Sequence, residues 1–237
     1  MKKSTFIGLI LSLCFAFSLK SQVHKYVQVH DEYYDTKPIH FGFMISHAST
    51  NFLLGASPKN LSNVAPLLAL NASSPKTSGF QIGGTVNYAY DIHYEVRSGI
   101  NIALYERQIQ FNEITPTGAN PTKSYFREST WLEIPVNLKY RSLRRKNHRI
   151  YMLGGFKFGI EANVKRTGEQ IQAKTTDVSL EYGFGFEKFY KFFKFNPELK
   201  FSHGINNLYL SPLGSTSQFS RLNQYNSHTI SLLFYFE

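Results

Sequence analysis

The chain has 237 residues, of which 18% are charged and 16% aromatic, and its formal net charge is +10. A mean hydropathy of -0.26 excludes a protein made of membrane-spanning helices, but it allows a membrane barrel, whose alternating strands average to such a value. This length suits one all-β domain or two small domains.

The first 21 residues have the pattern of an export signal. The chain begins with a basic Met-Lys-Lys, and residues 6–17 form an apolar run that is too short to span a bilayer. Small and polar residues come next, so we expect cleavage near Ser21, with cleavage after Ser18 as the alternative. Residues 1–21 are therefore predicted to be a signal peptide.

The single cysteine, Cys14, lies inside this apolar run. Lipidation at Cys14 is an alternative, but Leu13 stands where lipoprotein processing requires a small side chain. Loss of residues 1–21 removes three lysines, so the net charge falls from +10 to +7, and no cysteine remains. We therefore expect an exported chain without disulfides or thiol chemistry, whose basic character suits anionic lipid or an acidic partner rather than nucleic acid.

Residues 22–37 are polar and mixed in charge, and we expect them to form an exposed periplasmic segment. From residue 38 onward, apolar and polar residues alternate with the period of two that is typical of β-strands. The alternation predicts eight strands, at residues 38–46, 79–90, 94–105, 131–141, 150–162, 177–187, 194–204 and 229–236. The third pattern fades beyond residue 105, as if that strand continues past an apolar band.

The strand predicted at 131–141 shows the alternation most clearly. One of its faces is apolar and consists of Leu132, Ile134, Val136, Leu138 and Tyr140. The other face is polar and consists of Glu133, Pro135, Asn137, Lys139 and Arg141. The apolar face would point into the core of a soluble sandwich, whereas it would meet lipid in a membrane barrel.

Three features of the whole chain favour the membrane barrel. The apolar faces consist almost wholly of Ile, Leu, Val, Phe and Tyr, with aromatic residues often near strand ends. The opposite faces carry small, polar and charged residues that suit a narrow lumen. Long connections, among them 47–76, alternate with short ones, as extracellular loops and periplasmic turns do in outer-membrane barrels. We therefore predict an eight-stranded antiparallel transmembrane β-barrel of the outer-membrane type at residues 38–237.

The alternative fold is a periplasmic or secreted eight-stranded barrel of the lipocalin kind, which would hide its apolar face inside. Side chains just fill the interior of a membrane barrel with eight strands, so we expect no wide pore.

Charged residues on the polar faces must pair if they point into a narrow lumen. We predict an interior charge network made of Glu95, Arg97, Glu133, Lys139, Lys157, Glu161, Glu181 and Lys200. Such a network would stabilise the barrel, and a proton or ion path is the alternative.

A basic turn follows the strand at 131–141, and a basic-aromatic turn follows residue 187. Together they predict a periplasmic patch made of Arg141, Arg144, Arg145, Lys146, Arg149, Lys188 and Lys191, with Lys194 close by. This patch is either a set of solvated turns that meet anionic lipid headgroups, or a docking surface for an acidic periplasmic partner.

The sequence contains no nucleophile elbow, phosphate-binding loop or metal-ligand spacing, so we expect no enzyme, no cofactor and no small-molecule substrate. One alternative is an outer-leaflet lipid-modifying enzyme that uses Ser202 and His203. Otherwise His203 is an interfacial histidine beside an ordinary serine. His40 is expected to be a hydrogen-bonded residue of the lumen rather than a ligand.

Two stretches resemble a known family. The strand at 131–141 resembles the Leu-Glu-Ile-Pro strand of small outer-membrane barrels of the Bacteroidetes, a strand shared by many barrels of unknown role. The start of the barrel is similar to that of the PorT (SprT) proteins of the type IX secretion system: Lys37-Pro38-Ile39-His40-Phe41-Gly42-Phe43. The resemblance implies a non-enzymatic outer-membrane component that binds other machinery proteins. It would be needed for secretion of proteins with a C-terminal sorting domain, and for gliding in organisms that glide.

Overall fold

The computed structural model describes residues 29–56, 70–115, 118–119, 122–162, 171–210, 219 and 222–237, so the predicted signal peptide and residues 22–28 lie outside the described residues. A 3₁₀ turn, η1 (Tyr34–Thr36), precedes the strands. The strands are β1 (Ile39–Ala56), β2 (Leu70–Ser73), β3 (Thr77–Ala89), β4 (Tyr94–Thr115), β5 (Gly118–Ala119), β6 (Lys123–Arg141), β7 (His148–Glu161), β8 (Thr176–Phe189), β9 (Lys194–Gly204) and β10 (Leu222–Phe236).

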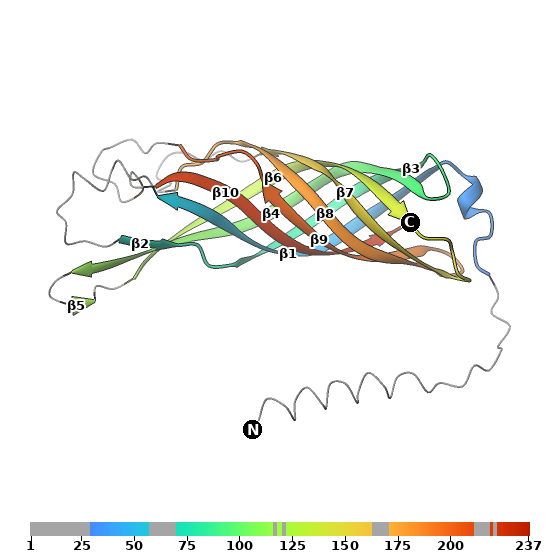
Figure 1. Cartoon of the computed structure of the whole chain (residues 1–237), viewed down its shortest axis with the longest axis horizontal. Helices are drawn as coiled ribbons and strands as arrows, with labels where there is room; N and C mark the ends of the chain where they lie inside the picture. Colours follow the sequence, from blue (N-terminus) through green and yellow to red (C-terminus); the bar gives the residue numbers. More distant parts are fainter. Residues whose placement is uncertain are drawn as a thin grey trace, which may run out of the picture.

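Eight of these strands close into one antiparallel barrel (Figure 1). Each long strand pairs with the next long strand along the chain, and β1 pairs with β10 to close the ring. The two short strands, β2 and β5, add to the outer part of β4. The predicted eight-stranded antiparallel barrel is confirmed.

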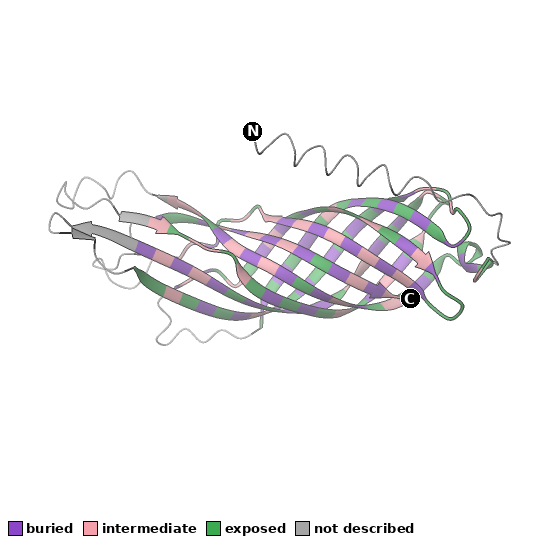
Figure 2. Ribbon diagram, turned by 90° about the horizontal axis from the view of Figure 1, so that it is seen from below, coloured by how far each residue is buried: buried purple, intermediate pink, exposed green. Residues whose placement is uncertain are grey.

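The apolar face of the barrel is its outer surface. Along the long strands, buried residues alternate with exposed or half-buried ones (Figure 2). Within the apolar band, most of the exposed residues are large and hydrophobic. Ile100 on β4 is 59% exposed and Phe184 on β8 is 56% exposed. The polar residues that alternate with such positions along each strand point inward and are buried. The lipocalin alternative is therefore wrong, because a soluble barrel would bury the face that is exposed here. Among the described residues, no helix is long and apolar enough to cross a membrane.

Both described ends of the chain lie at one end of the barrel. The last residue, the η1 turn and the short turns at 90–93, 142–147 and 190–193 share this end (Figure 1). Short turns lie on the periplasmic side of outer-membrane barrels, so we take this end as periplasmic and the opposite end as extracellular.

Four strands run several residues farther toward the extracellular end than their predicted ranges, and for β4 the fading pattern beyond residue 105 indicates this. β1 continues to residue 56 and β4 to residue 115, while β6 begins at residue 123 and β10 at residue 222. The predicted loop 47–76 is thus wrong in part, since residues 47–56 and 70–73 are strands. In parts of these extensions the pattern inverts: Glu106 and Glu128 face outward and Ile109 and Phe111 are buried inside, although Leu53 and Phe126 remain exposed on the outer face. Outside the lipid, an outward face no longer has to be apolar, so the expected pattern ends before the strand does.

The outward face predicts a strong penalty for a charge placed in its middle. Val136→Arg puts a guanidinium in the centre of the apolar face of β6 and should cost about 2–4 kcal/mol in the free energy of unfolding. Urea unfolding of the barrel in lipid vesicles measures it. Gln108→Arg, on the outward face of the β4 extension, is the matched control and should cost far less. Equal costs at both positions would contradict the assigned membrane boundary.

Candidate functional site

The lumen is filled by paired charges. All eight residues of the predicted interior network lie inside the barrel, and none of them is more than 6% exposed. Near the periplasmic end, Lys139 Nζ lies 2.7 Å from Glu95 Oε1 and 2.8 Å from Glu187 Oε1. Glu95 also accepts a hydrogen bond of 2.6 Å from Arg141. A buried charge is tolerated only when it is paired in this way, so the loss of any one of these partners would leave an uncompensated charge inside the ring of strands.

The same pairing continues toward the middle of the barrel. Arg97 Nη1 lies 2.8 Å from Glu198 Oε2, and the Arg97 guanidinium lies 4.0 Å from the centre of the Tyr235 ring. Lys200 Nζ lies 3.8 Å from Glu198 and 3.4 Å from Glu181. Two buried glutamates outside the predicted set, Glu187 and Glu198, thus belong to the same network.

A third group of charges lies closer to the extracellular end. Lys157 Nζ lies 2.9 Å from Glu133 Oε1, which also accepts a hydrogen bond of 2.9 Å from the Tyr105 hydroxyl. Arg127 Nη2 donates to both carboxylate oxygens of Glu161 at 2.8 Å. Ion pairs therefore follow one another along much of the lumen, which leaves the interior occupied by side chains.

The predicted periplasmic patch is divided between two environments. Arg141 and Arg149 are only 2% exposed and point into the lumen, and so does the neighbouring Lys194. The expectation that these three belong to a surface patch is wrong. They lie in the inward-facing register of their strands: Arg149, for example, pairs with Glu187 across β7 and β8. Arg141 shares its parity with Glu133 and Lys139, a signal that the sequence already contained.

The remaining patch residues lie at the periplasmic surface. Arg145, Lys146 and Lys191 are exposed, and Lys188 is half-buried, with its ammonium 4.8 Å from the centre of the Tyr190 ring. Arg144 is not available as a free surface charge, because its guanidinium lies 3.7 Å from the centre of the Phe189 ring and donates to backbone carbonyls of residues 30 and 31.

Most of residues 29–37 are exposed, as expected for the segment before the barrel, but Tyr34 at its centre is buried in the periplasmic mouth. Tyr34 is 5% exposed and inserts its ring into the mouth. Its hydroxyl donates to Glu237 Oε2 at 2.8 Å and accepts a hydrogen bond from Lys194. Burial and the Glu237 carboxylate raise the pKa of Tyr34, so the hydroxyl remains a neutral donor. We call residues 29–37 the periplasmic cap.

Two further contacts hold the periplasmic cap in place. Asp35 Oδ1 lies 2.8 Å from Arg149 Nη1, so the interior network reaches the cap directly. The side-chain oxygen of Asn147 accepts a hydrogen bond of 2.8 Å from the backbone N–H of His30. Together with Arg144, these contacts fasten the segment to the turn between β6 and β7.

The first residues of the barrel form the seat of the periplasmic cap. The His40 ring stacks on the Tyr34 ring at 3.8 Å, and its Nε2 lies 3.1 Å from the Tyr34 carbonyl oxygen. His40 is therefore a hydrogen-bonded lumen residue, as expected. Gly42 faces the same interior, where a Cβ atom would lie only 2.6 Å from Glu237 Cγ. The stretch that carried the family resemblance thus leaves room for the C-terminal side chain and supports Tyr34.

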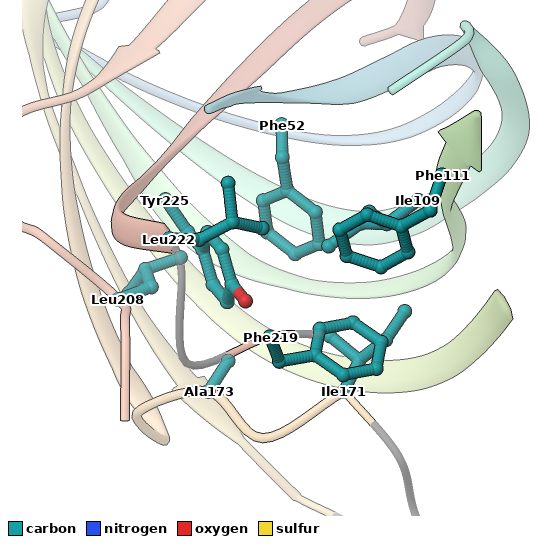
Figure 3. Packing of buried hydrophobic residues seen from close by; sticks show 9 residues of the cluster. All are labelled: Phe52, Ile109, Phe111, Ile171, Ala173, Leu208, Phe219, Leu222 and Tyr225. Atoms are coloured by element: carbon teal, nitrogen blue, oxygen red, sulfur yellow. The ribbon is translucent and has the colours of Figure 1, made fainter. Parts of the chain in front are cut away.

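The extracellular end of the lumen is closed by an apolar cluster instead of charges. Figure 3 shows its side chains converging on one another from several strands and loops. The cluster consists of Phe52, Ile109, Phe111, Ile171, Ala173, Leu208, Phe219, Leu222 and Tyr225. We call it the outer plug. With the periplasmic cap at the other end, side chains cover both mouths of the barrel.

The residues of the enzymatic alternative do not form a catalytic pair. Ser202 is buried on the inner face, whereas His203 lies on the outer face, because consecutive strand residues point to opposite sides. The Nε2 atom of His203 lies 3.0 Å from the Tyr182 hydroxyl, and its Nδ1 atom lies 3.0 Å from His228 Nδ1. In the described part of the chain, no three His, Cys, Asp or Glu side chains are grouped so that they could hold a metal ion.

Comparison with known families decides the class of this protein. Residues 21–210 match the family described as the outer membrane protein beta-barrel domain, which is more than half of the chain. The chain belongs to this family. Its localisation in the outer membrane, predicted from the sequence, is thereby confirmed, and the exposed apolar face of the barrel is its lipid-facing surface. A search of curated proteins finds no match.

Several solved outer-membrane barrels are similar in outline. The outer membrane protein OprG of Pseudomonas aeruginosa is 12% identical, with a TM-score of 0.45 over 89% of this chain and 98% of that one. Neisserial surface protein A is 10% identical, with a TM-score of 0.42 over 84% and 98% of the two chains. The attachment invasion locus protein Ail of Yersinia pestis, in complex with a heparin analogue, is 12% identical, with a TM-score of 0.36 over 85% and 99%. Likenesses this distant carry no information about a shared role.

The division of the basic patch predicts opposite results for two arginines of the same turn region. Arg149→Met should lower the free energy of unfolding by about 3–5 kcal/mol, because it removes a partner of the buried Glu187. Arg145→Met should change it by less than about 0.5 kcal/mol, because Arg145 is exposed. Urea titrations of the two variants in the same lipid vesicles make the comparison. Equal stabilities would mean that Arg149 is not a lumen residue.

The periplasmic cap predicts a difference between two adjacent tyrosines. Tyr34→Ala removes the ring from the mouth, so the backbone amides of residues 31–37 should exchange hydrogen faster. Tyr33→Ala is the control, since Tyr33 is 73% exposed and its removal should leave exchange unchanged. Mass spectrometry of peptides from the two variants reports the exchange. Rapid exchange in the unmodified protein would contradict a docked cap.

Proposed function

We propose that this outer-membrane barrel is a non-enzymatic, partner-binding component of the type IX protein secretion machinery, and of gliding where the organism glides. The observation that carries the proposal is the closure of both ends of the lumen, by the periplasmic cap and by the outer plug. A barrel closed in this way is suited to presenting surfaces rather than to conducting solutes. The similarity of its first residues to PorT (SprT) proteins supports this particular machinery.

The partner surface would be the periplasmic end. Its turns present exposed basic residues next to exposed aromatic ones: Lys191 Nζ lies 5.2 Å from the centre of the Phe192 ring, and Phe192 is 86% exposed. Tyr90, on another turn, is 80% exposed. Aromatic residues are enriched in protein interfaces, and positive charge would steer an acidic periplasmic partner. The solvated-turn alternative, in which the same residues touch anionic lipid headgroups, predicts no effect on secretion.

Deletion of the gene tests the proposed machinery. Proteins with C-terminal sorting domains should disappear from the culture medium and accumulate in the periplasm, because their transport would lack an outer-membrane component. Mass spectrometry of the medium and of the periplasmic fraction measures both changes. An unchanged set of secreted proteins would overturn the type IX assignment and leave the fold untouched.

A charge-reversal variant tests the partner surface. Arg145→Glu, Lys146→Glu, Lys188→Glu and Lys191→Glu together reverse the surface charges and leave the buried arginines in place. Secretion should stop while the barrel still assembles, which its heat-dependent mobility in gels reports. Lys123→Glu, an exposed lysine toward the extracellular end, is the control. Normal secretion in the reversed variant would remove the reason for assigning a partner to these turns.

A generic structural or adhesive barrel is the second candidate function. The outer plug favours it, because it gives the region beyond the lipid a packed apolar core that could hold a binding surface. Removal of residues 57–69, which connect β1 and β2, separates the two functions. The adhesive function predicts lost surface binding with normal secretion, whereas the secretion function, which acts through the periplasmic turns, predicts that this deletion changes neither.

A further inference from the structure

Two histidines touch on the outer surface of the barrel, near the extracellular edge of its apolar band. His203 on β9 and His228 on β10 are cross-strand partners, and both are half-buried. Their Nδ1 atoms lie 3.0 Å apart, with ring centres 4.5 Å apart. The pair lies far from the periplasmic partner surface, so the proposed function leaves it unexplained.

The spacing of the two nitrogens suits a shared metal ion. Neutral imidazole is a good ligand for copper, nickel and zinc, and such ions bind nitrogen at about 2.0–2.1 Å. Two nitrogens 3.0 Å apart both reach that distance when the angle at the ion is about 95°. This angle is close to that between neighbouring ligands in tetragonal copper(II), whereas the tetrahedral geometry of zinc needs a separation of about 3.3 Å.

Tyr182 is placed to orient one of the two rings. Its hydroxyl lies 3.0 Å from His203 Nε2, on the side of the ring opposite to His228. If Nε2–H of His203 donates to this hydroxyl, Nδ1 is unprotonated and its lone pair is available to a metal ion. Hydrogen bonds of this kind commonly fix the tautomer and direction of a metal-binding histidine.

A third ligand is available on the next strand. Asn51 on β1 is the cross-strand partner of His228, and its buried side-chain oxygen has no hydrogen-bond partner. Among the described residues, no three His, Cys, Asp or Glu side chains are placed to hold one metal ion together, so the described part of the site offers two nitrogens and this amide oxygen. Water or a phosphate oxygen of an outer-leaflet lipid would complete the coordination.

We propose that His203 and His228 form a site for a divalent transition-metal ion, with copper(II) as the best fit, which links β9 to β10 at the outer edge of the membrane.

Copper binding by the full mature chain tests the proposal. The protein is purified from outer membranes without a histidine tag, and every variant carries His24→Ala. Cleavage after Ser21 would make His24 the third residue of the mature chain, where it and the terminal amine could bind copper by themselves. Equilibrium dialysis against CuCl₂ should give one bound ion per chain, and His203→Ala or His228→Ala should abolish it. Tyr182→Phe should weaken the affinity by about 10–100-fold.

Matched variants separate this site from general copper binding. His47→Ala removes an exposed, outward-facing histidine of β1 and should leave the copper content unchanged. His203→Gln and His228→Gln repeat the test with polar side chains, and unaltered gel mobility shows that each variant is folded. CuCl₂ should raise the unfolding temperature of the parent and of His47→Ala but not of the site variants. Equal copper content in the parent and the site variants would show adventitious binding and overturn the proposal.

Discussion

One buried carboxylate, that of Glu187, connects four strands in the periplasmic half of this barrel. Glu187 on β8 lies 2.8 Å from Lys139 on β6, 2.5 Å from Arg149 on β7 and 3.6 Å from Lys194 on β9. Removing a charge from water costs several kcal/mol, so each of these groups depends on the others for its compensation. Four consecutive strands are thereby tied across the lumen as well as along their hydrogen-bonded edges.

The periplasmic cap depends on the same charges. Arg149 contacts Asp35 as well as Glu187, and Lys194 contacts both Tyr34 and the C-terminal Glu237. The cap therefore docks on a surface that exists only when the barrel is closed and its last residue is in place. This arrangement couples the assembly of β10 to the covering of the mouth, and it presents the periplasmic turns as one ordered surface.

The predicted strand bounds are accurate for the parts of the strands within the membrane and less accurate for the parts beyond it. Lipid requires one face of each strand to be apolar, so alternation alone locates β9 at its observed bounds and places the other strands within a few residues on the periplasmic side. Beyond the lipid, inward-facing Phe52 and outward-facing Glu106 reverse the pattern, so the extensions of β1, β6 and β10 were missed, whereas the fading pattern after residue 105 predicted that of β4. Local alternation cannot show where the environment of the outer face changes from lipid to water.

The alternation within single strands also predicted part of the candidate site, whereas contacts between distant parts of the chain were not predicted. The alternation of inward and outward positions identified eight interior charged residues. The same alternation also assigns Arg141 to the lumen and not to the surface patch. The docking of Tyr34 had no local signal, because its main partner, Glu237, lies 203 residues away in the chain. The contact between His203 and His228 likewise depends on the register between two strands, which the sequence does not state.

Whether the barrel is closed at both ends can be measured as the conductance of the full mature chain in planar lipid bilayers. A closed lumen gives no stable conductance steps, because the cap, the paired charges and the outer plug occupy it. Steady single-channel openings of the unmodified protein would contradict it, and would make the lumen an ion path rather than a support for binding surfaces.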